Sequence, residues 1–173
     1  LEGQFKAFKA EVTVQAAEIT GRSGKVNMKN IIASYNPAAR TRIMVTAHWD
    51  SRPFADKDDN KPTQPVPGAN DGASGVAILL EIARNLGMHP TKVGVDLMLW
   101  DAEDNGDYND NDSWCLGSQY WTKHLHKPNY NAQYGINLDM VGAANARYSK
   151  DGYSLQMARQ YTDNLWSIAA QMG

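Results

Sequence analysis

The sequence predicts an α/β layer sandwich built on a mixed β-sheet. Two observations lead to this fold class: segments with helical periodicity alternate with short apolar runs, and several of those runs end at an acid or a histidine. Alternating helices and strands are typical of α/β domains. The chain has 173 residues, enough for one domain with a core, and no repeat or linker divides it.

The first third of the chain is expected to form a helix followed by a hairpin. Phe5, Phe8 and Val12 stand at helical spacing. Two apolar runs then flank Asn36-Pro37, a turn signal that favours an antiparallel hairpin. The expected elements are a helix over 2–20, a turn over 21–24, strands over 28–35 and 43–48, and a long loop over 51–69.

The remainder alternates between helices and strands. Val76, Leu79 and Ala83 lie on one face of a helical pattern that Gly87 is suited to end. The run from Val93 to Trp100 is uniformly apolar, as in a buried strand. The expected elements are helices over 74–86, 118–125 and 154–172, strands over 93–100 and 134–140, and a polar loop over 105–113.

Composition excludes several classes of function. The net charge of −2 does not favour nucleic acid or an anionic membrane as a partner. No apolar run approaches the roughly 20 residues that span a bilayer. Cys115 is the only cysteine, which excludes a disulfide framework and a cysteine-rich zinc site.

Candidate functional residues follow the predicted strands. His48 and Asp50 lie two apart at a strand end and therefore face the same side, where Asp50 can orient the imidazole. The non-functional alternative is a half-buried histidine beside a surface acid. Glu103 and Asp104 follow the next strand and point in opposite directions, so they can take different tasks. Asp139 closes a further strand. Active sites of open α/β sheets lie at such carboxyl ends.

A loop of small residues, Gly68-Ala69-Asn70-Asp71-Gly72-Ala73-Ser74-Gly75, carries one more acid before a helix. An aspartate near a helix N-cap is the simple explanation of Asp71. The crowding of glycines instead indicates a functional loop that a ligand or backbone approaches closely. Carboxylates with a histidine and no thiolate suit a hydrolytic Zn²⁺ site, or less readily Mn²⁺.

The acidic loop over 104–112 allows a calcium alternative. Asp107, Asn109 and Asn111 match the first half of an EF-hand loop. However, Asp112 stands where the required glycine belongs, and no glutamate closes the loop at its twelfth position. The other interpretation of this segment is a solvated rim.

Five short motifs, in this order, resemble the zinc aminopeptidase superfamily, which includes the glutaminyl cyclases. They are His48-Trp49-Asp50, Gly68-Ala69-Asn70-Asp71, Asp101-Ala102-Glu103-Asp104, Gly117-Ser118 and Asn137-Leu138-Asp139-Met140. The resemblance implies a three-layer α/β/α sandwich with a mixed, mainly parallel sheet. It also implies that Asp71 and Asp104 bind the metal, that Glu103 is the general acid/base, and that Asp50 and Asp101 lie behind the ligands.

The resemblance leaves two reactions open. In two-metal aminopeptidases His48 and Asp139 complete a second metal site, whereas in single-zinc cyclases Asp139 joins a proton relay. Gly117 lies 14 positions after Glu103, and the loop between them ends in Asp112-Ser113-Trp114-Cys115-Leu116. That length resembles the bacterial cyclases, with Trp114 in the substrate loop. The expected substrates of either enzyme are peptide or protein N-termini.

One family feature is missing from the sequence. The superfamily has a further histidine ligand well after the Asp139 motif, but no histidine follows His126. We therefore expect residues 1–173 to be a single, C-terminally incomplete catalytic domain with an incomplete zinc site and no activity by itself. A metal-free binding module on the same fold is the non-enzymatic alternative. The family also implies an extracytoplasmic location.

Overall fold

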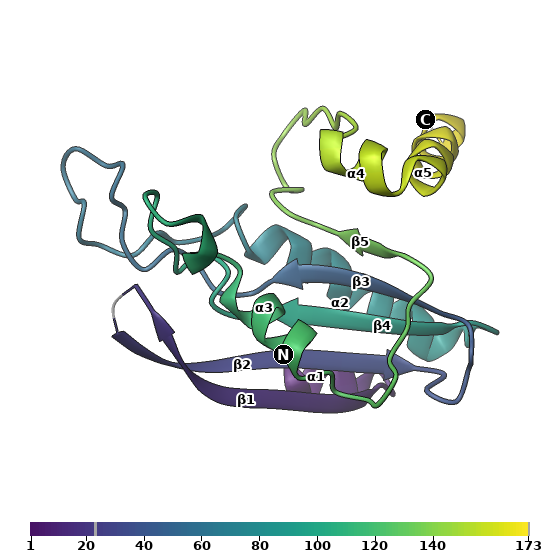
Figure 1. Ribbon diagram of the computed structural model, residues 1–173. Coiled ribbons are helices and arrows are strands. Elements are labelled where there is room, and N and C mark those ends of the chain that lie inside the picture. Colours follow the sequence, from purple (N-terminus) through teal and green to yellow (C-terminus); the bar gives the residue numbers. More distant parts are fainter. Residues whose placement is uncertain (23, 173) are drawn as a thin grey trace. The chain divides into compact units, whose positions relative to one another are not determined.

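The computed structural model describes residues 1–22 and 24–172 (Figure 1). It divides into two compact units, Leu1–Ala143 and Ala144–Gly173. Every candidate site residue belongs to the first unit, and whether the two units form one domain stays a prediction. The elements in chain order are α1 (Glu2–Ala7), β1 (Glu11–Gly21), β2 (Gly24–Tyr35), β3 (Arg42–His48), α2 (Ala73–Met88), β4 (Gly94–Trp100), η1 (Asn111–Ser113), α3 (Leu116–Lys123), β5 (Gly135–Asn137), α4 (Gly152–Met157) and α5 (Arg159–Met172).

The first unit contains a mixed sheet of strand order β1-β2-β4-β3-β5, which confirms the predicted mixed sheet. β2 pairs antiparallel with β1 and with β4. β3 pairs parallel with β4 and with β5. Parallel pairing is therefore confined to the β4-β3-β5 half of the sheet, where the carboxyl ends of all three strands lie at one edge.

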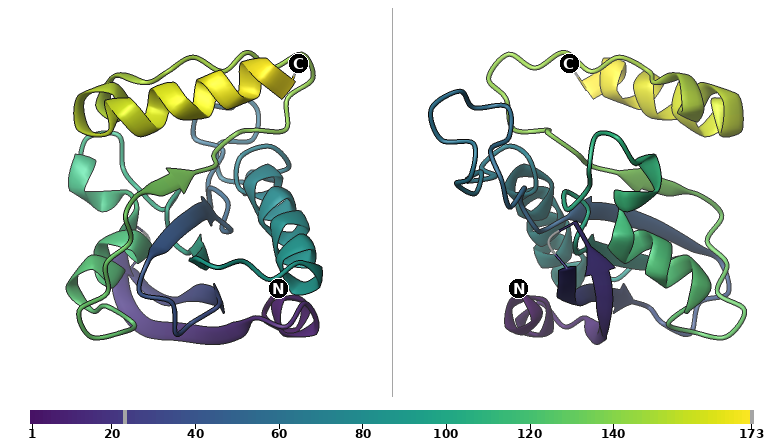
Figure 2. Two further views of the ribbon diagram at one scale, coloured as in Figure 1. Left: turned by 90° about the vertical axis from the view of Figure 1, so that its right-hand side faces the viewer. Right: turned by 60° about the vertical axis from the view of Figure 1, so that its left-hand side comes forward.

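Helices cover both faces of this sheet, as the resemblance implies. Side chains of a strand alternate between faces. Leu97 and Leu99 of β4 pack with Leu79 of α2 in one core cluster, which also includes residues of α1. Met98 packs with Trp121 of α3 in a second cluster. The left view of Figure 2 places α2 and α3 on opposite sides of the sheet, so the first unit has three layers.

The predicted helix over 2–20 is wrong beyond Ala7. Lys9 adopts a left-handed conformation with φ 66°, after which the chain turns into β1. β1 pairs with β2 along its whole length, from Glu11 opposite Ser34 to Gly21 opposite Gly24. A long ladder of backbone hydrogen bonds thus outweighs a helical spacing that rested on few apolar residues.

The predicted antiparallel hairpin of 28–35 with 43–48 is also wrong, because β4 lies between β2 and β3. The Asn36-Pro37 connection leads to the far side of β4 instead of reversing the chain onto β2. Arg42 Nη1 donates to the carbonyls of Asn36 and Pro37 at 3.0 and 3.3 Å, which ties this connection to the start of β3.

The other elements match the predictions with shifted bounds. The strand predicted over 134–140 shortens to Gly135–Asn137. The helix predicted over 154–172 divides at Ala158 into α4 and α5, and Asp151 caps α4 by accepting from the Ser154 N–H at 2.9 Å. The turn predicted over 21–24 includes Ser23, which lies outside the described residues. Within residues 1–22 and 24–172, no helix combines the length and apolar character needed to cross a membrane.

Candidate metal centre

The predicted site residues gather at the carboxyl edge of the parallel strands. His48 is the last residue of β3, and Glu103 and Asp104 follow β4. Asp139 follows β5, and Asp71 precedes α2. Their ligand atoms form two groups, each within 4.8 Å: His48 with Glu103 and Asp104, and His48 with Asp71 and Asp139. The parallel register of β3 with its neighbours explains why residues so distant in sequence meet.

His48 stands at the centre of both groups and is only 3% exposed. On one side of the ring, Nε2 lies 3.0 Å from Asp71 Oδ1 and 3.6 Å from Asp139 Oδ1. On the other side, Nδ1 lies 3.6 Å from Asp50 Oδ1 and 4.0 Å from Glu103 Oε2. Neither ring nitrogen has a hydrogen-bond partner in the described part of the protein. Buried polar atoms without partners are rare and indicate a missing ligand or ion.

The electrostatics of the cluster point to the same conclusion. Burial disfavours a charge on His48, but Asp139, Asp50 and Glu103 outweigh it and raise the pKa of the imidazole to about 11. Burial and the neighbouring charges of Asp71 and Glu103 raise the pKa of Asp104 to about 6. So many carboxylates around one imidazole form a strongly anionic pocket, which a divalent cation would neutralise.

The residues present fit a zinc ion. Imidazole nitrogen and carboxylate oxygen are both zinc ligands, and among the described residues neither nitrogen of His48 has a hydrogen-bond partner. Zinc would bind the neutral imidazole and so displace the proton that the surrounding carboxylates favour on it. The group of His48, Asp71 and Asp139 offers three donors, and Asp104 belongs to the adjoining group. The chain can therefore contribute ligands to one or two ions at this edge.

The glycine-rich loop lets Asp71 approach the end of β3. Gly72 has φ 96°, and a Cβ atom there would stand 2.6 Å from the carbonyl oxygen of Asp50. Two polar side chains of the loop hold the segment that follows Asp139. Asn70 Oδ1 accepts from the Gly142 N–H at 2.8 Å, and Ser74 Oγ accepts from the Val141 N–H at 3.0 Å. Asp71 and Asp139 are thus placed by one connected structure.

Asp50 holds the backbone of the paired acids, and its role in orienting the imidazole stays a prediction. Its two carboxylate oxygens accept from the backbone N–H groups of Glu103 and Asp104, each at 3.1 Å. Its distance of 3.6 Å from His48 Nδ1 is longer than a hydrogen bond. Asp50 therefore fixes the backbone that presents the paired acids, and it contributes negative charge beside the imidazole.

Glu103 is held by a residue that the sequence did not single out for the site. Cys115 Sγ donates to Glu103 Oε1 at 3.3 Å, and the Cys115 N–H donates to the Glu103 carbonyl at 3.0 Å. Burial raises the pKa of the thiol to about 12, with the Glu103 charge adding to the effect, so the thiol stays protonated as a donor. Ala102, Cys115 and Met140 all have positive φ, and such strain in ordinary residues gathers at functional sites.

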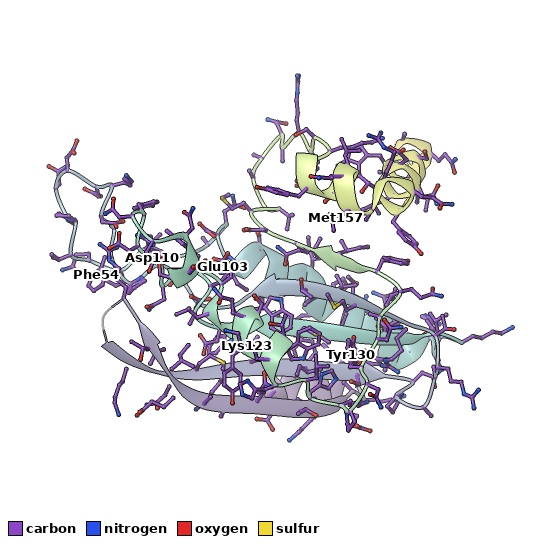
Figure 3. The ribbon with its side chains drawn as sticks, viewed as in Figure 1. Phe54, Glu103, Asp110, Lys123, Tyr130 and Met157 are labelled. Carbon is purple, nitrogen blue, oxygen red and sulfur yellow. The ribbon has the colours of Figure 1, made fainter. Side chains whose placement is uncertain are left out.

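The pKa of Glu103 itself is raised, chiefly by burial. Asp139 and Asp50 add to this increase, while the Cys115 hydrogen bond and the charge on His48 oppose it. A carboxylate with a raised pKa binds a proton more readily than an exposed one, as a general acid/base must. Figure 3 labels Glu103 beyond the end of β4 and Asp110 in the acidic loop.

Asp101 and Trp114 have structural contacts around the site. Asp101 accepts from the backbone N–H groups of Lys29 and Ala102, at 2.7 and 2.9 Å, and so fastens the end of β4 to β2. Trp114 packs inside its own loop, with its ring 5.3 Å from that of Tyr108 and its indole N–H donating to the Asp107 carbonyl.

Two acids of the acidic loop accept hydrogen bonds within the loop, and Asp107 Oδ2 also lies 3.6 Å from Arg22 Nε. Asp107 Oδ1 accepts from the backbone and side chain of Asn109, and Asp110 caps η1 by accepting from the Asp112 N–H at 3.0 Å. Among the described residues, the groups of His, Cys, Asp and Glu close enough to share an ion all include His48. The calcium alternative gains no support from these contacts.

Comparison with known proteins relates this site to characterised structures. A glutaminyl cyclase from Porphyromonas gingivalis is 44% identical, with a TM-score of 0.96 over 99% of this chain and 61% of its own. A Zn-dependent exopeptidase from Parabacteroides distasonis is 45% identical, with a TM-score of 0.95 over 99% of this chain and 62% of its own. Aminopeptidase YwaD from Bacillus subtilis is 30% identical over 83% of this chain and 27% of its own length.

The chain therefore spans about three fifths of the two solved structures and a smaller share of the aminopeptidase. A family model, described as peptidase family M28, matches residues 30–173. That range contains all the strand-end acids and the histidine between them. The chain belongs to peptidase family M28.

Proposed function

We propose that the whole protein is a zinc-dependent glutaminyl-peptide cyclotransferase, which converts N-terminal glutamine of peptides or proteins to pyroglutamate and releases ammonia. The chain is about equally similar to a solved glutaminyl cyclase and to a solved Zn-dependent exopeptidase, each over 99% of this chain, so the observation that carries the proposal is a local one. It is the long loop between Glu103 and Gly117, the feature by which the sequence resembles cyclases rather than aminopeptidases.

In this proposal Asp71 and Asp104 bind one zinc ion. Bound zinc acts as a Lewis acid that polarises the side-chain amide carbonyl of the substrate glutamine. His48, which both groups of ligand atoms share, can bind the same ion or a second one. The donor set supports zinc over a softer metal, because it has imidazole and carboxylates but no thiolate.

Glu103 moves the proton. It accepts a proton from the α-amine of the substrate as the amine nitrogen attacks the amide carbon and forms the ring C–N bond. It then returns that proton to the departing nitrogen, so that the former amide C–N bond breaks and ammonia leaves. Because Glu103 Oε1 is engaged by the Cys115 thiol, Oε2 is the oxygen suited to this exchange.

In the proposed reaction Asp139 keeps a fixed negative charge in the proton relay with Glu103. Its pKa is lowered, first by its interaction with His48, so it stays charged while Glu103 changes protonation state. Burial is the main cause of the raised pKa of Glu103, and the negative charge of Asp139 adds to it by favouring the protonated form. Glu103 is therefore the group that gains and loses the proton, and Asp139 is the group that keeps its charge.

An aminopeptidase is the second candidate, and one observation favours it. His48, Asp71 and Asp139 already form a three-donor group, as a second metal site would require. With two ions bound, Glu103 would take the proton of a water molecule that attacks the first peptide bond. Both reactions begin from a free N-terminal amine, so the same residues serve either one.

Product analysis on the zinc-loaded whole protein separates the two reactions. A glutamine-initiated dipeptide and a leucine-initiated dipeptide are each incubated with the protein, and ammonia and free amino acids are measured. Ammonia from the first substrate, without free amino acid from either, is the expected result. Free leucine without ammonia would overturn the cyclase proposal in favour of the aminopeptidase. If neither ammonia nor free amino acid is formed, both enzymatic proposals are contradicted and a binding module is favoured.

The extracytoplasmic location implied by the resemblance stays a prediction, which fractionation of the source cells would test. Peptide N-termini are the partners that the proposed reaction requires.

A further inference from the structure

Arg52 is a buried cation next to the paired acids. It lies just after the end of β3, at the start of the long loop over 51–69, which contains four prolines and is called the proline-rich loop below. Its exposed fraction is 8%. Its Nη1 donates to the backbone carbonyl of Asp104 at 3.0 Å and to that of Gly106 at 3.2 Å. The guanidinium therefore binds the main chain of Asp104 and of the residues just after it, and does not bind the Asp104 carboxylate.

The other edge of the guanidinium is fixed by Asp56. Arg52 Nε and Nη2 donate to the two oxygens of Asp56 at 2.8 and 2.7 Å, a paired contact that sets the plane of the group. Asp56 also accepts from Arg22 Nη1 at 2.7 Å. A charge buried to this degree persists only when its hydrogen bonds are supplied, and Arg52 has them on both edges.

Aromatic rings stack on the same guanidinium. Its central carbon lies 4.7 Å from the ring centre of Tyr108 and 4.8 Å from that of Trp114. Gly106 stands directly against the Trp114 ring, where a Cβ atom would collide with the indole. The proline-rich loop and the acidic loop are thus joined through one side chain.

We infer that Arg52 is the positioning residue for Asp104, and that it sets the affinity of the site for zinc by holding the Asp104 backbone in place. The inference rests on the proposed function, because it takes Asp104 to be a zinc ligand. Asp50 binds the Asp104 N–H and Arg52 binds the Asp104 carbonyl, so the residue is held from both sides. Residues behind metal ligands typically change metal affinity by about 10- to 100-fold when they are substituted.

Lysine cannot replace arginine in this place. Its ammonium keeps the charge but lacks the planar fork that reaches Asp56 on one edge and two carbonyls on the other. Arg52→Lys therefore removes the geometry and keeps the charge, which separates positioning from simple electrostatics.

The test is zinc affinity, measured on the folded whole protein by competition with a chromogenic chelator. Arg52→Lys is expected to weaken zinc binding by about tenfold. Arg22→Lys is the matched control, because it makes the same substitution in the other guanidinium that binds Asp56, which does not contact the Asp104 backbone. It should leave the affinity within about twofold of the native value. Thermal melting of each variant identifies those that fold.

Unchanged zinc affinity in folded Arg52→Lys would overturn the inference. Equal weakening by Arg22→Lys would also overturn it, because the effect would then belong to the loop in general. If Arg52→Lys does not fold, Asp56→Asn decides by the same criterion, since it loosens Arg52 and keeps the guanidinium. Asp104→Asn tests the underlying assignment: native zinc affinity in that variant would refute Asp104 as a ligand, whereas weak binding there with no change in Arg52→Lys would refute only the role of Arg52.

Discussion

Two buried polar clusters lie at opposite ends of the paired strands β3 and β4. Near the start of these strands Asp96, fully buried, accepts from Ser34, from Arg42 Nε and Nη2, and from Tyr130, at 2.6 to 2.9 Å. At their carboxyl ends His48, equally buried, has carboxylates on both sides and no hydrogen-bond partner for either nitrogen among the described residues. In Figure 3, Tyr130 and Glu103 mark these opposite ends.

The difference separates structure from function. The Asp96 cluster is complete, because one guanidinium neutralises one carboxylate and the remaining oxygen sites are satisfied by hydroxyl groups. Such a network rigidifies a fold and binds nothing further. The His48 cluster has an excess of negative charge, and among the described residues neither nitrogen of His48 has a hydrogen-bond partner. A bound cation is what would complete it.

Removing the proposed base should have the largest effect. Glu103→Gln keeps the shape of the side chain but cannot accept the proton, so turnover should fall by about 10²- to 10⁴-fold with unchanged thermal stability. Glu81→Gln, the same substitution on the exposed face of α2, is the control and should retain native turnover. Full activity in Glu103→Gln would refute its assigned role.

Asp96→Ala should instead act on stability. Removing one member of a buried ion pair leaves Arg42 without its partner and costs about 3–5 kcal/mol in the free energy of unfolding. Urea denaturation measures this loss, and the folded fraction should retain native zinc affinity. Glu18→Ala, which breaks the exposed pair with Lys25, should change stability little. A variant that loses zinc while keeping its stability would contradict the division between the two clusters.

The pH dependence of stability should follow from the same cluster. Burial opposes the charge on Asp96, but the hydrogen bonds from Arg42, Ser34 and Tyr130 outweigh it and lower its pKa. Because the pKa in the folded protein lies below that in the unfolded chain, about 3.9, the stabilisation is complete above that value. The difference in unfolding free energy between the native protein and Asp96→Ala should narrow only below about pH 4. If this difference in unfolding free energy narrowed between pH 5 and 8, the lowered pKa of Asp96 would not be the cause.

The smallest expected effect concerns Cys115. Cys115→Ala removes the donor to Glu103 Oε1 and should lower kcat about two- to tenfold, in keeping with one weak hydrogen bond, and change KM little. Cys115→Ser restores a donor of similar geometry and should recover most of the activity. Steady-state kinetics on both variants decides the matter. Equal loss in the alanine and serine variants would point to packing rather than hydrogen bonding.

Much of the site was predictable because its residues recur at one kind of position. His48, Glu103, Asp104 and Asp139 each follow an apolar run, and parallel strands bring such positions to one edge. The residues that sequence analysis missed act through contacts without a local signal. Arg52 reads as one more polar residue in a loop, and its burial depends on Asp56, Tyr108 and Trp114 coming together in three dimensions.

The errors in the fold have a related cause. The Asn36-Pro37 turn indicates that the chain reverses between β2 and β3. It does not indicate that β4 will pair between these two strands. Likewise, the spacing of Phe5, Phe8 and Val12 fits a helix, whereas pairing with β2 decides the conformation from Glu11 onward. Local patterns define turns and periodicity, and long-range pairing defines which strands are neighbours.

Anomalous diffraction at the zinc edge, from crystals of the whole protein grown with zinc, shows directly whether the His48 cluster binds a metal and the Asp96 cluster does not. We predict a peak at the His48 cluster with ligand oxygens of Asp71 and Asp104 at about 2.0–2.2 Å, and no peak at the Asp96 cluster. A peak in the acidic loop alone, or no peak at the His48 cluster in zinc-saturated crystals, would contradict the account.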